Sequence, residues 1–229
     1  MRTTWHRWLL AGLLIAAVGL GTGCNMLALP FFLLPGVADK AEAKCKLVSE
    51  DKEKEVKVLI LAAGGLETRP EFLRVDKELS VLLSRQLQEN FKNNKEKVTL
   101  VPTSHVEKYK DEHQNWRALP SAEIGKYFEA DYVINLTINS VTLYEPGSAN
   151  MLFRGNAAIS IDVVDVSKGT EGAIYEEEYS IEYPRRGPIP ASDSNSNAAQ
   201  FRLAFLNKMA QELSWRFASH PQEDHMKFD

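Results

Sequence analysis

The chain has 229 residues, of which 44% are hydrophobic, and its 27 basic and 31 acidic residues give a net charge of −4. This length suits one domain with an export signal and a tether, and the hydrophobic fraction excludes a globally disordered chain. A mildly acidic chain without a basic patch argues against a nucleic-acid partner.

The N-terminal residues follow the order of an export signal. A positively charged start precedes an apolar run at 9–20, and the small residues 21–23 lead into Cys24. Bacteria attach a diacylglycerol to a cysteine that directly follows the cleavage site. We therefore predict a lipoprotein signal peptide over residues 1–23 and lipidation, palmitate included, at Cys24. The match to a bacterial lipobox is incomplete, because Gly21 stands where a branched apolar residue is usual.

Two other interpretations of this segment stay open. A plain secretory signal cut at the same place would leave Cys24 as an incidental thiol. Alternatively, the apolar stretch continues to Leu34 and could form an uncleaved membrane anchor, since about 20 apolar residues span a bilayer. Pro30 and Pro35 oppose one continuous helix. All three interpretations place the domain outside the cytoplasm. Asn25 is not the aspartate that often retains lipoproteins in the inner membrane, which favours the outer membrane, facing the periplasm.

Residues 24–55 form the predicted tether, which is first apolar and then charged. Lys, Glu, Asp and Ala dominate 37–55, so we expect a solvated spacer there rather than a docking segment. The second cysteine, Cys45, lies in this spacer. It is free or available to another chain if Cys24 is acylated, and a disulfide between the two is the alternative. Neither cysteine has a neighbour at metal-ligand spacing.

The first half of the expected domain, residues 56–220, alternates strands and helices. A buried strand at 56–61 is followed by an amphipathic helix at 70–93 and a short strand at 98–101. Two shorter helices follow, with Thr103 or Ser104 capping one and Ser121 capping the other.

Three strands with period-two alternation and a final helix make up the rest of the domain. The alternation predicts an antiparallel arrangement in which each strand has one buried and one wetter face. The final amphipathic helix covers 198–220, and 221–229 reads as a flexible tail. The order β-α-β-α-α-β-β-β-α predicts a single α/β (α+β) domain with helices packed on a mixed β-sheet.

This order, together with particular residues, resembles a superfamily of envelope lipoproteins. The superfamily includes the curli-secretion lipoprotein, the lipoprotein activators of penicillin-binding proteins and the N-terminal domain of the Tol translocation protein. The similar pieces are the strand 56–61, the helix end 82–87, the run 124–134 with its Ala-Asp-Tyr strand start, and the segments 141–144 and 161–165. The resemblance implies a binding or assembly module rather than an enzyme. A secretion channel is not expected, because the loop 145–150 is too short for a membrane-spanning hairpin.

The candidate catalytic and metal motifs have simpler structural explanations. Gly64-Gly65 lacks the further residues of a phosphate-binding loop, and a strand-ending turn explains it. His105 and His113 lie two turns apart, too far for one metal ion, and His220 and His225 belong to the tail. Glu177 stands at a position of its strand where the alternation calls for an apolar residue. An inward charge on an edge strand, which discourages pairing with another chain, explains it. We therefore predict no catalytic residue, no metal and no cofactor.

Aromatic and arginine side chains in loops mark the candidate partner surface. Trp116 lies in a polar segment between helices, and a loop contributes Tyr183, Arg185 and Arg186. Such residue types are enriched at binding hot spots. The alternative is that Trp116 covers the core and that the two arginines are solvated.

The sequence therefore favours a non-catalytic cell-envelope lipoprotein, anchored to a membrane, whose domain binds or assembles another envelope protein. The alternative is an extracytoplasmic domain that binds a glycan or a small molecule. An exported hydrolase has no motif to support it.

Overall fold

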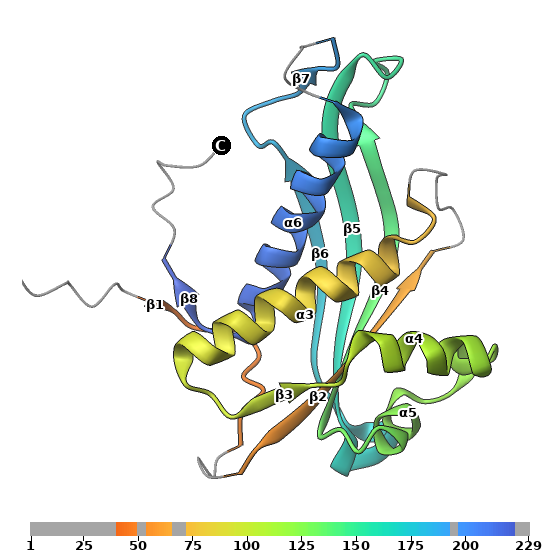
Figure 1. Cartoon of the computed structure of the whole chain (residues 1–229), viewed down its shortest axis with the longest axis vertical. Helices are drawn as coiled ribbons and strands as arrows, with labels where there is room; N and C mark the ends of the chain where they lie inside the picture. The colour runs from red at the N-terminus through yellow and green to blue at the C-terminus, as the bar shows by residue number, and fades with distance from the viewer. Residues whose placement is uncertain (1–39, 50–53, 66–71, 193–196, 223–229) are drawn as a thin grey trace, which may run out of the picture. The chain divides into compact units, whose positions relative to one another are not determined.

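A mixed six-stranded sheet forms the centre of the fold (Figure 1). The computed structural model describes residues 40–49, 54–65, 72–192 and 197–222, which lie within one unit, residues 40–229. In this part of the chain the strand order is β3-β2-β4-β5-β6, and the short strand β7 pairs with β5. The strands of the sheet are β2 (Val56–Gly64), β3 (Val98–Leu100), β4 (Tyr132–Tyr144), β5 (Leu152–Asp165), β6 (Ala173–Tyr183) and β7 (Ile189–Pro190).

Helices and a small two-stranded ribbon complete the described part. The α-helices are α3 (Val75–Asn94), α4 (Thr103–Glu112), α5 (Ser121–Tyr127) and α6 (Ala198–Phe217). Two 3-10 helices, η2 (Trp116–Ala118) and η3 (Val166–Glu171), lie in the connections. The ribbon pairs β1 (Lys40–Ala41) with β8 (His220–Pro221).

The sheet combines parallel and antiparallel pairs. β2 runs parallel to both β3 and β4, because helical crossovers connect these strands, whereas β4, β5 and β6 form an antiparallel meander. The predicted α/β fold with its mixed sheet is confirmed, and the main elements follow the order β-α-β-α-α-β-β-β-α. On β5, buried residues alternate with half-buried ones over nearly the whole strand, as the period of two predicts.

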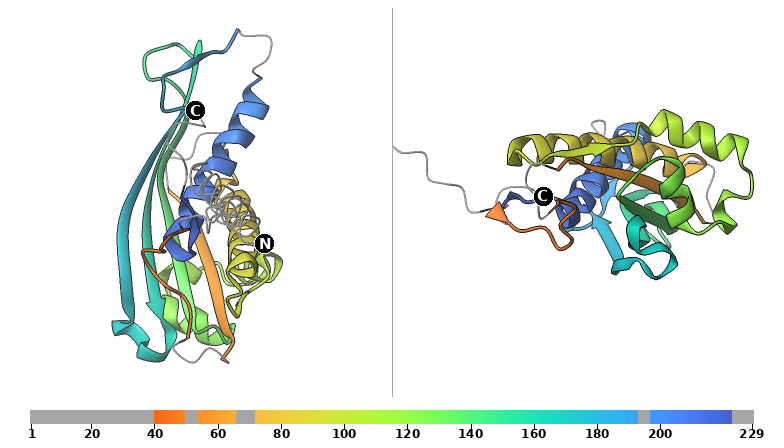
Figure 2. Two further views of the ribbon diagram at one scale, coloured as in Figure 1. Left: turned by 90° about the vertical axis from the view of Figure 1, so that its left-hand side faces the viewer. Right: turned by 90° about the horizontal axis from the view of Figure 1, so that it is seen from below.

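Two hydrophobic cores lie on the two faces of the sheet. On β2, Val58 and Ile60 belong to one core, and the intervening Leu59 belongs to the other. The larger core packs against α3 and α6, which lie on the same side of the sheet in Figure 2. The smaller core joins β2 and the start of β4 to α4 and α5, through residues such as Val106 and Ile124. Helices therefore cover one face broadly and the other only near β2.

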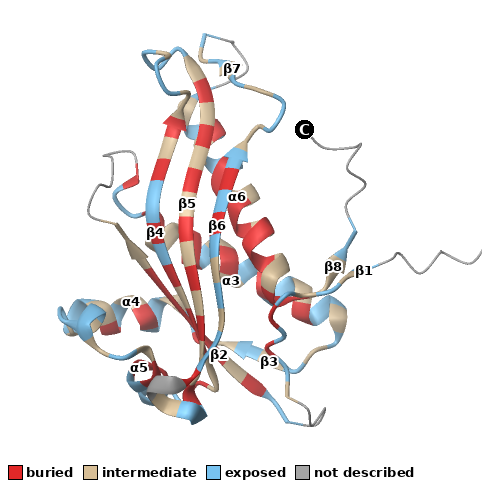
Figure 3. Ribbon diagram, turned by 180° about the vertical axis from the view of Figure 1, so that it is seen from behind, coloured by how far each residue is buried: buried red, intermediate tan, exposed pale blue. Residues whose placement is uncertain are grey.

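The rest of the second face is open to solvent. Alternate residues of β4, β5 and β6 are exposed or half-buried there, which gives the strands the banded pattern of Figure 3. The residues on this face are mostly polar or acidic. They include Asn135, Thr137 and Asn139 on β4, Ser160 and Asp162 on β5, and Glu176 and Glu178 on β6.

Residues 40–49 pack against the domain, whereas the sequence suggested a solvated spacer there. Cys45 and Leu47 are 7% and 0% exposed and belong to the larger core. The Cys45 N–H donates to the Arg216 carbonyl oxygen at 2.8 Å, and the ribbon β1–β8 holds the start of the segment. The segment can pack despite its charges, because Cys45 and Leu47 point inward and the charged side chains beside them face water. We call residues 40–49 the docked strap.

The strap also accounts for the inward carboxylate of β6. Lys44 Nζ lies 2.7 Å from Glu177 Oε1, Arg216 Nε lies 3.5 Å from Glu177 Oε2, and the Tyr175 hydroxyl donates to the same carboxylate. Burial raises the pKa of Glu177, but the hydrogen bonds from Lys44 and Tyr175 and the charge of Arg216 outweigh it, so the net pKa is lowered. Among the described strands β6 pairs only with β5, as expected for an edge strand.

Some element boundaries differ from the sequence expectation. α3 begins at Val75, and Pro70 lies outside the described residues. The expected hydroxyl caps are replaced by Pro102 and Pro120 at the N-cap positions of α4 and α5. α6 ends at Phe217, because the chain turns there into β8. None of the helices in the described ranges is long and apolar enough to cross a bilayer.

Candidate binding cleft

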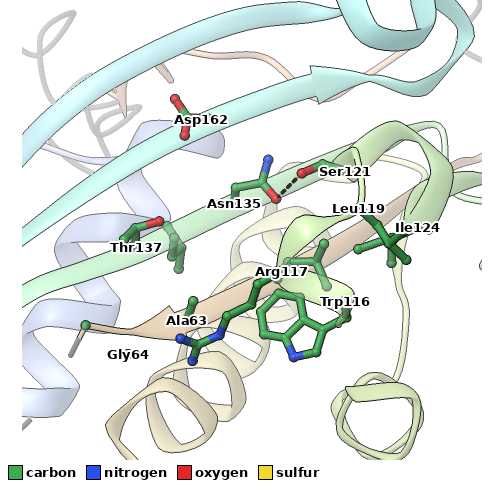
Figure 4. A pocket seen from close by; sticks show the side chains of 13 residues that line it. Ala63, Gly64, Trp116, Arg117, Leu119, Ser121, Ile124, Asn135, Thr137 and Asp162 are labelled. Atoms are coloured by element: carbon green, nitrogen blue, oxygen red, sulfur yellow. Dashed lines mark hydrogen bonds between the residues drawn. The ribbon is translucent and has the colours of Figure 1, made fainter. Parts of the chain in front are cut away.

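A cleft of about 490 Å³ opens where β2 ends, on the partly covered face of the sheet (Figure 4). Volumes of about 300–1,000 Å³ are typical of ligand sites. The end of β2 and the following glycine, η2, α5 and the polar positions of β4 and β5 line it. Its lining comprises Leu61, Ala63, Gly64, Gly65, Trp116, Arg117, Leu119, Ser121, Ile124, Asn135, Leu136, Thr137 and Asp162.

The glycine at the end of β2 shapes one edge of the cleft. The Gly65 N–H donates to the Ile138 carbonyl oxygen at 2.9 Å. A Cβ on Gly65 would lie 2.8 Å from that same oxygen, so a side chain does not fit. The second glycine of the Gly64-Gly65 pair is therefore explained by the close approach of two backbones.

Trp116 forms one wall, and two cations contact its ring. Lys110 Nζ lies 5.1 Å and the Arg117 guanidinium 5.4 Å from the centre of its ring, within the range of cation–π contacts. Lys110 is itself fixed, since it donates to the Ala62 carbonyl oxygen at 2.8 Å and pairs with Glu107 at 2.9 Å. The indole is half-buried and packs against the smaller core. Trp116 therefore serves both as a cover of the core and as a rigid wall of the cleft.

Two groups of opposite charge face the cleft from different elements. Arg117 is exposed on η2, and Asp162 is half-buried on β5. Burial raises the pKa of Asp162, and the carboxylates of Glu176 and Glu178 raise it further. Glu176 lies directly opposite Asp162 in the strand register. Asp162 is thus a carboxylate whose ionised form is disfavoured by its own neighbours.

The hydrogen bonding of the cleft is suited to binding rather than to nucleophilic catalysis. The Ser121 hydroxyl donates to Asn135 Oδ1 at 2.9 Å, and an amide oxygen is not a base that could activate a hydroxyl. Within the described ranges, no three His, Cys, Asp or Glu side chains form a group able to hold a metal ion.

Of the predicted partner residues, Trp116 alone lines the cleft. Tyr183 packs on the opposite side of the sheet, with ring centres 5.7 Å from Phe201 and 6.4 Å from Phe205. Arg185 Nη2 donates to the buried Glu212 Oε1 at 2.9 Å, while 58% of the arginine side chain stays exposed to solvent.

The two remaining predicted site residues are Arg186 and Cys24. Arg186 is exposed beside Arg185 but does not line the cleft, so the four predicted partner residues do not form one surface. Cys24, the predicted lipidation site, lies outside the described residues.

His113, directly after α4, takes a structural position, whereas His105 on α4 is exposed. The His113 ring stacks on Tyr109 at 4.2 Å between centres, and Tyr109 also contacts Tyr127 and Phe128. His113 Nδ1 lies 3.0 Å from the Tyr109 carbonyl oxygen. This aromatic contact, rather than a metal site, explains the position of His113.

Five further residues line the cleft that were not predicted as site residues from the sequence: Arg117, Ser121, Asn135, Thr137 and Asp162. The strand alternation does place Asn135, Thr137 and Asp162 on the polar phases of their strands. Solvated strand faces have the same pattern, so the alternation does not distinguish a cleft wall from an ordinary surface.

Comparison with known proteins gives structural similarity only. No family model and no curated protein matches the chain. Among solved structures, the chain is similar to the PelC dodecamer from Paraburkholderia phytofirmans, with 10% identity over 78% of this chain and 96% of that chain and a TM-score of 0.41. It is also similar to lipoprotein GNA1162 from Neisseria meningitidis, with 14% identity over 69% of this chain and 99% of that chain and a TM-score of 0.38.

A third similar structure is TolB from Acinetobacter baumannii, with 11% identity over 77% of this chain and 28% of that chain and a TM-score of 0.32. With TM-scores between 0.32 and 0.41, the similarity assigns no residue role, ligand or partner to this chain.

Proposed function

We propose that this protein is a non-catalytic envelope lipoprotein, held on a bacterial membrane through Cys24, that binds another envelope component in the cleft beside Trp116. The export signal and the cysteine that follows it support the location. The outer membrane, facing the periplasm, is the proposed site, because Asn25 follows the cysteine.

The one-sided covering of the sheet is the observation that carries the binding role. α3 and α6 close one face, whereas α4 and α5 stop at β2 and the start of β4. The cleft lies at this border, and the polar face of β4 to β6 continues from it. An uncovered face that adjoins a rigid aromatic wall offers a partner both a recess and a surface.

The chemistry of the cleft supports binding without turnover. Its serine hydroxyl is engaged by an amide oxygen. Its ionisable side chains, Arg117 and Asp162, lack a second carboxylate or a histidine among the lining residues with which to divide acid and base roles.

Site-specific photo-crosslinking in intact cells tests the binding role. A photoreactive residue at Thr137, inside the cleft, is compared with one at Arg186, which is exposed but does not line it. We expect one dominant adduct from position 137 and none of the same mass from position 186. The same adduct from both positions, or none from position 137, would contradict the proposal.

The mass of the mature N-terminus tests the anchor. We expect a chain that begins at Cys24 and carries added acyl chains, and we expect Cys24→Ala to move the protein out of the membrane fraction. A cleaved chain without acyl groups would refute lipidation, and an intact residue 1 would support the uncleaved anchor instead.

A further inference from the structure

We propose that the cleft binds a short zwitterionic peptide, with the peptide carboxylate on Arg117 and the peptide ammonium group on Asp162. This inference rests on the proposed function, since it names the chemistry of the component that the cleft would bind. The observations that support the inference are the cavity and the two opposite charges that line it from different elements.

The two charges lie apart from each other. Arg117 belongs to η2 and Asp162 to β5, and Figure 4 shows their side chains on opposite sides of the cleft. The ion pairs within the described ranges do not join these two groups, although both line the same cavity. A ligand with one positive and one negative charge can form an ion pair with Arg117 and with Asp162 at once. A singly charged ligand can form only one of these ion pairs.

Arg117 is suited to a carboxylate. The guanidinium presents a planar set of donors that matches the two oxygens of a carboxylate, and such pairs are often bidentate. Its contact with the Trp116 ring, at 5.4 Å, restricts where the guanidinium can lie. Lys110 also contacts the indole and is itself held by the Ala62 carbonyl oxygen, so the ring that Arg117 contacts is supported before a ligand arrives.

Asp162 is suited to an ammonium group. Its carboxylate is half-buried and lies beside Glu176 and Glu178, and both neighbours disfavour its ionised form. A cation placed at this position removes that penalty and gains a charge-assisted hydrogen bond. Asn139 Nδ2 lies 3.4 Å from Glu178 Oε2, so an amide rather than a cation contacts this neighbour.

Neutral polar groups between the two charges suit a peptide backbone. Asn135 accepts from Ser121 through Oδ1, a bond drawn in Figure 4 that does not use its amide nitrogen. The nitrogen can donate to a peptide carbonyl. Thr137, next along the same face of β4, adds a hydroxyl that can donate or accept. An extended peptide of three residues spans about 10 Å and carries its two charges at opposite ends.

Calorimetric titration of the full chain in detergent tests the inference, with alanyl-alanyl-alanine as the probe. The same peptide with an acetylated N-terminus, and with an amidated C-terminus, removes one ligand charge at a time. We expect the peptide with two free ends to bind and each cap to weaken its Kd about tenfold or more, the size of one lost charge-assisted bond. Equal binding of capped and free peptides would overturn the proposal.

Charge-neutral variants of the cleft assign each ligand end to its wall. Arg117→Gln should abolish the preference for a free carboxylate and keep the preference for a free ammonium, and Asp162→Asn should do the reverse. Lys108→Gln and Glu123→Gln, which are exposed on α4 and α5 and do not line the cleft, are the matched controls and should keep both preferences. Circular dichroism of every variant checks the fold. Loss of both preferences in the controls, or of neither in the cleft variants, would overturn the assignment.

The outcome separates this inference from the proposed function. A crosslinked adduct from position 137, together with no binding of the free peptide at about 10 mM, refutes the zwitterionic ligand and leaves the binding role intact. Peptide binding that follows the expected pattern supports the ligand class, whether or not the adduct proves to be a protein.

Discussion

Leu47→Ala tests whether the docked strap contributes to the stability of the domain. Leu47 is 0% exposed and lies in the same core as Phe217 of α6. Replacing a fully buried leucine by alanine costs about 2–5 kcal/mol in folding free energy. The strap crosses the surface of the domain and can move inward to fill part of the space, so we expect the lower half of this range, about 2–3 kcal/mol.

Urea denaturation of the full chain in detergent, followed by tryptophan fluorescence, measures this cost. With a slope of about 2 kcal/mol per molar urea, the midpoint should fall by about 1–1.5 M. Val48→Ala is the matched control, because the neighbouring Val48 is 36% exposed, and its effect should stay within about 0.5 kcal/mol. If the two variants differ by less than about 0.5 kcal/mol, the strap is not packed as described and the reasoning fails.

Three further predictions concern the sheet and the buried cysteine of the strap. In Gly155→Ala the new Cβ would lie 2.6 Å from a ring carbon of Phe205, so unfolding free energy should fall by about 1–3 kcal/mol, and Phe205→Leu in the same chain should recover part of it. Asp162→Asn should raise Tm at about pH 7 by up to about 4 °C, because it removes a carboxylate opposed by Glu176, whereas no gain at that pH would contradict the charge repulsion. Because the pKa of Asp162 is raised in the folded chain, ionisation of this carboxyl destabilises the fold increasingly as pH rises through the carboxyl range. The gain in Tm from Asp162→Asn should therefore vanish at about pH 3, where the carboxyl is protonated. Burial raises the pKa of the Cys45 thiol to about 11, so iodoacetamide should modify it far more slowly in the folded chain than in urea, and equal rates would place the thiol at the surface.

The strands that carry one buried face were predictable from the sequence. On β4 and β5 the hydrophobic and polar residues alternate over most of their length, and burial follows this alternation. The docked strap has the same alternation of buried and exposed positions, but over too few residues to predict a packed segment. Cys45 and Leu47 are buried while Lys44, Lys46 and Val48 are exposed, a period-two pattern within a charged stretch.

The position of the cleft was not predictable in the same way. The uncovered part of the sheet depends on where α4 and α5 lie in the folded chain. No local pattern in the sequence predicts that position. Tyr183, at the end of β6, and the loop residue Arg185 have the composition of a binding surface but contact Phe201 and Glu212 of α6. Aromatic and arginine side chains also cover cores and pair with buried carboxylates, so residue type alone did not separate the two uses.

The ribbon of β1 and β8 brings the two ends of the domain together. Lys40 lies opposite Pro221 and Ala41 opposite His220, and paired Cα atoms in antiparallel strands lie about 4.5–5.5 Å apart. A few glycine residues could therefore join the ends, and new termini could be opened in the turn at Gly147, where an added Cβ meets nothing within 4 Å. Such a circular permutant would carry the same cleft on a chain whose ends lie in the turn at Gly147 rather than at the ribbon.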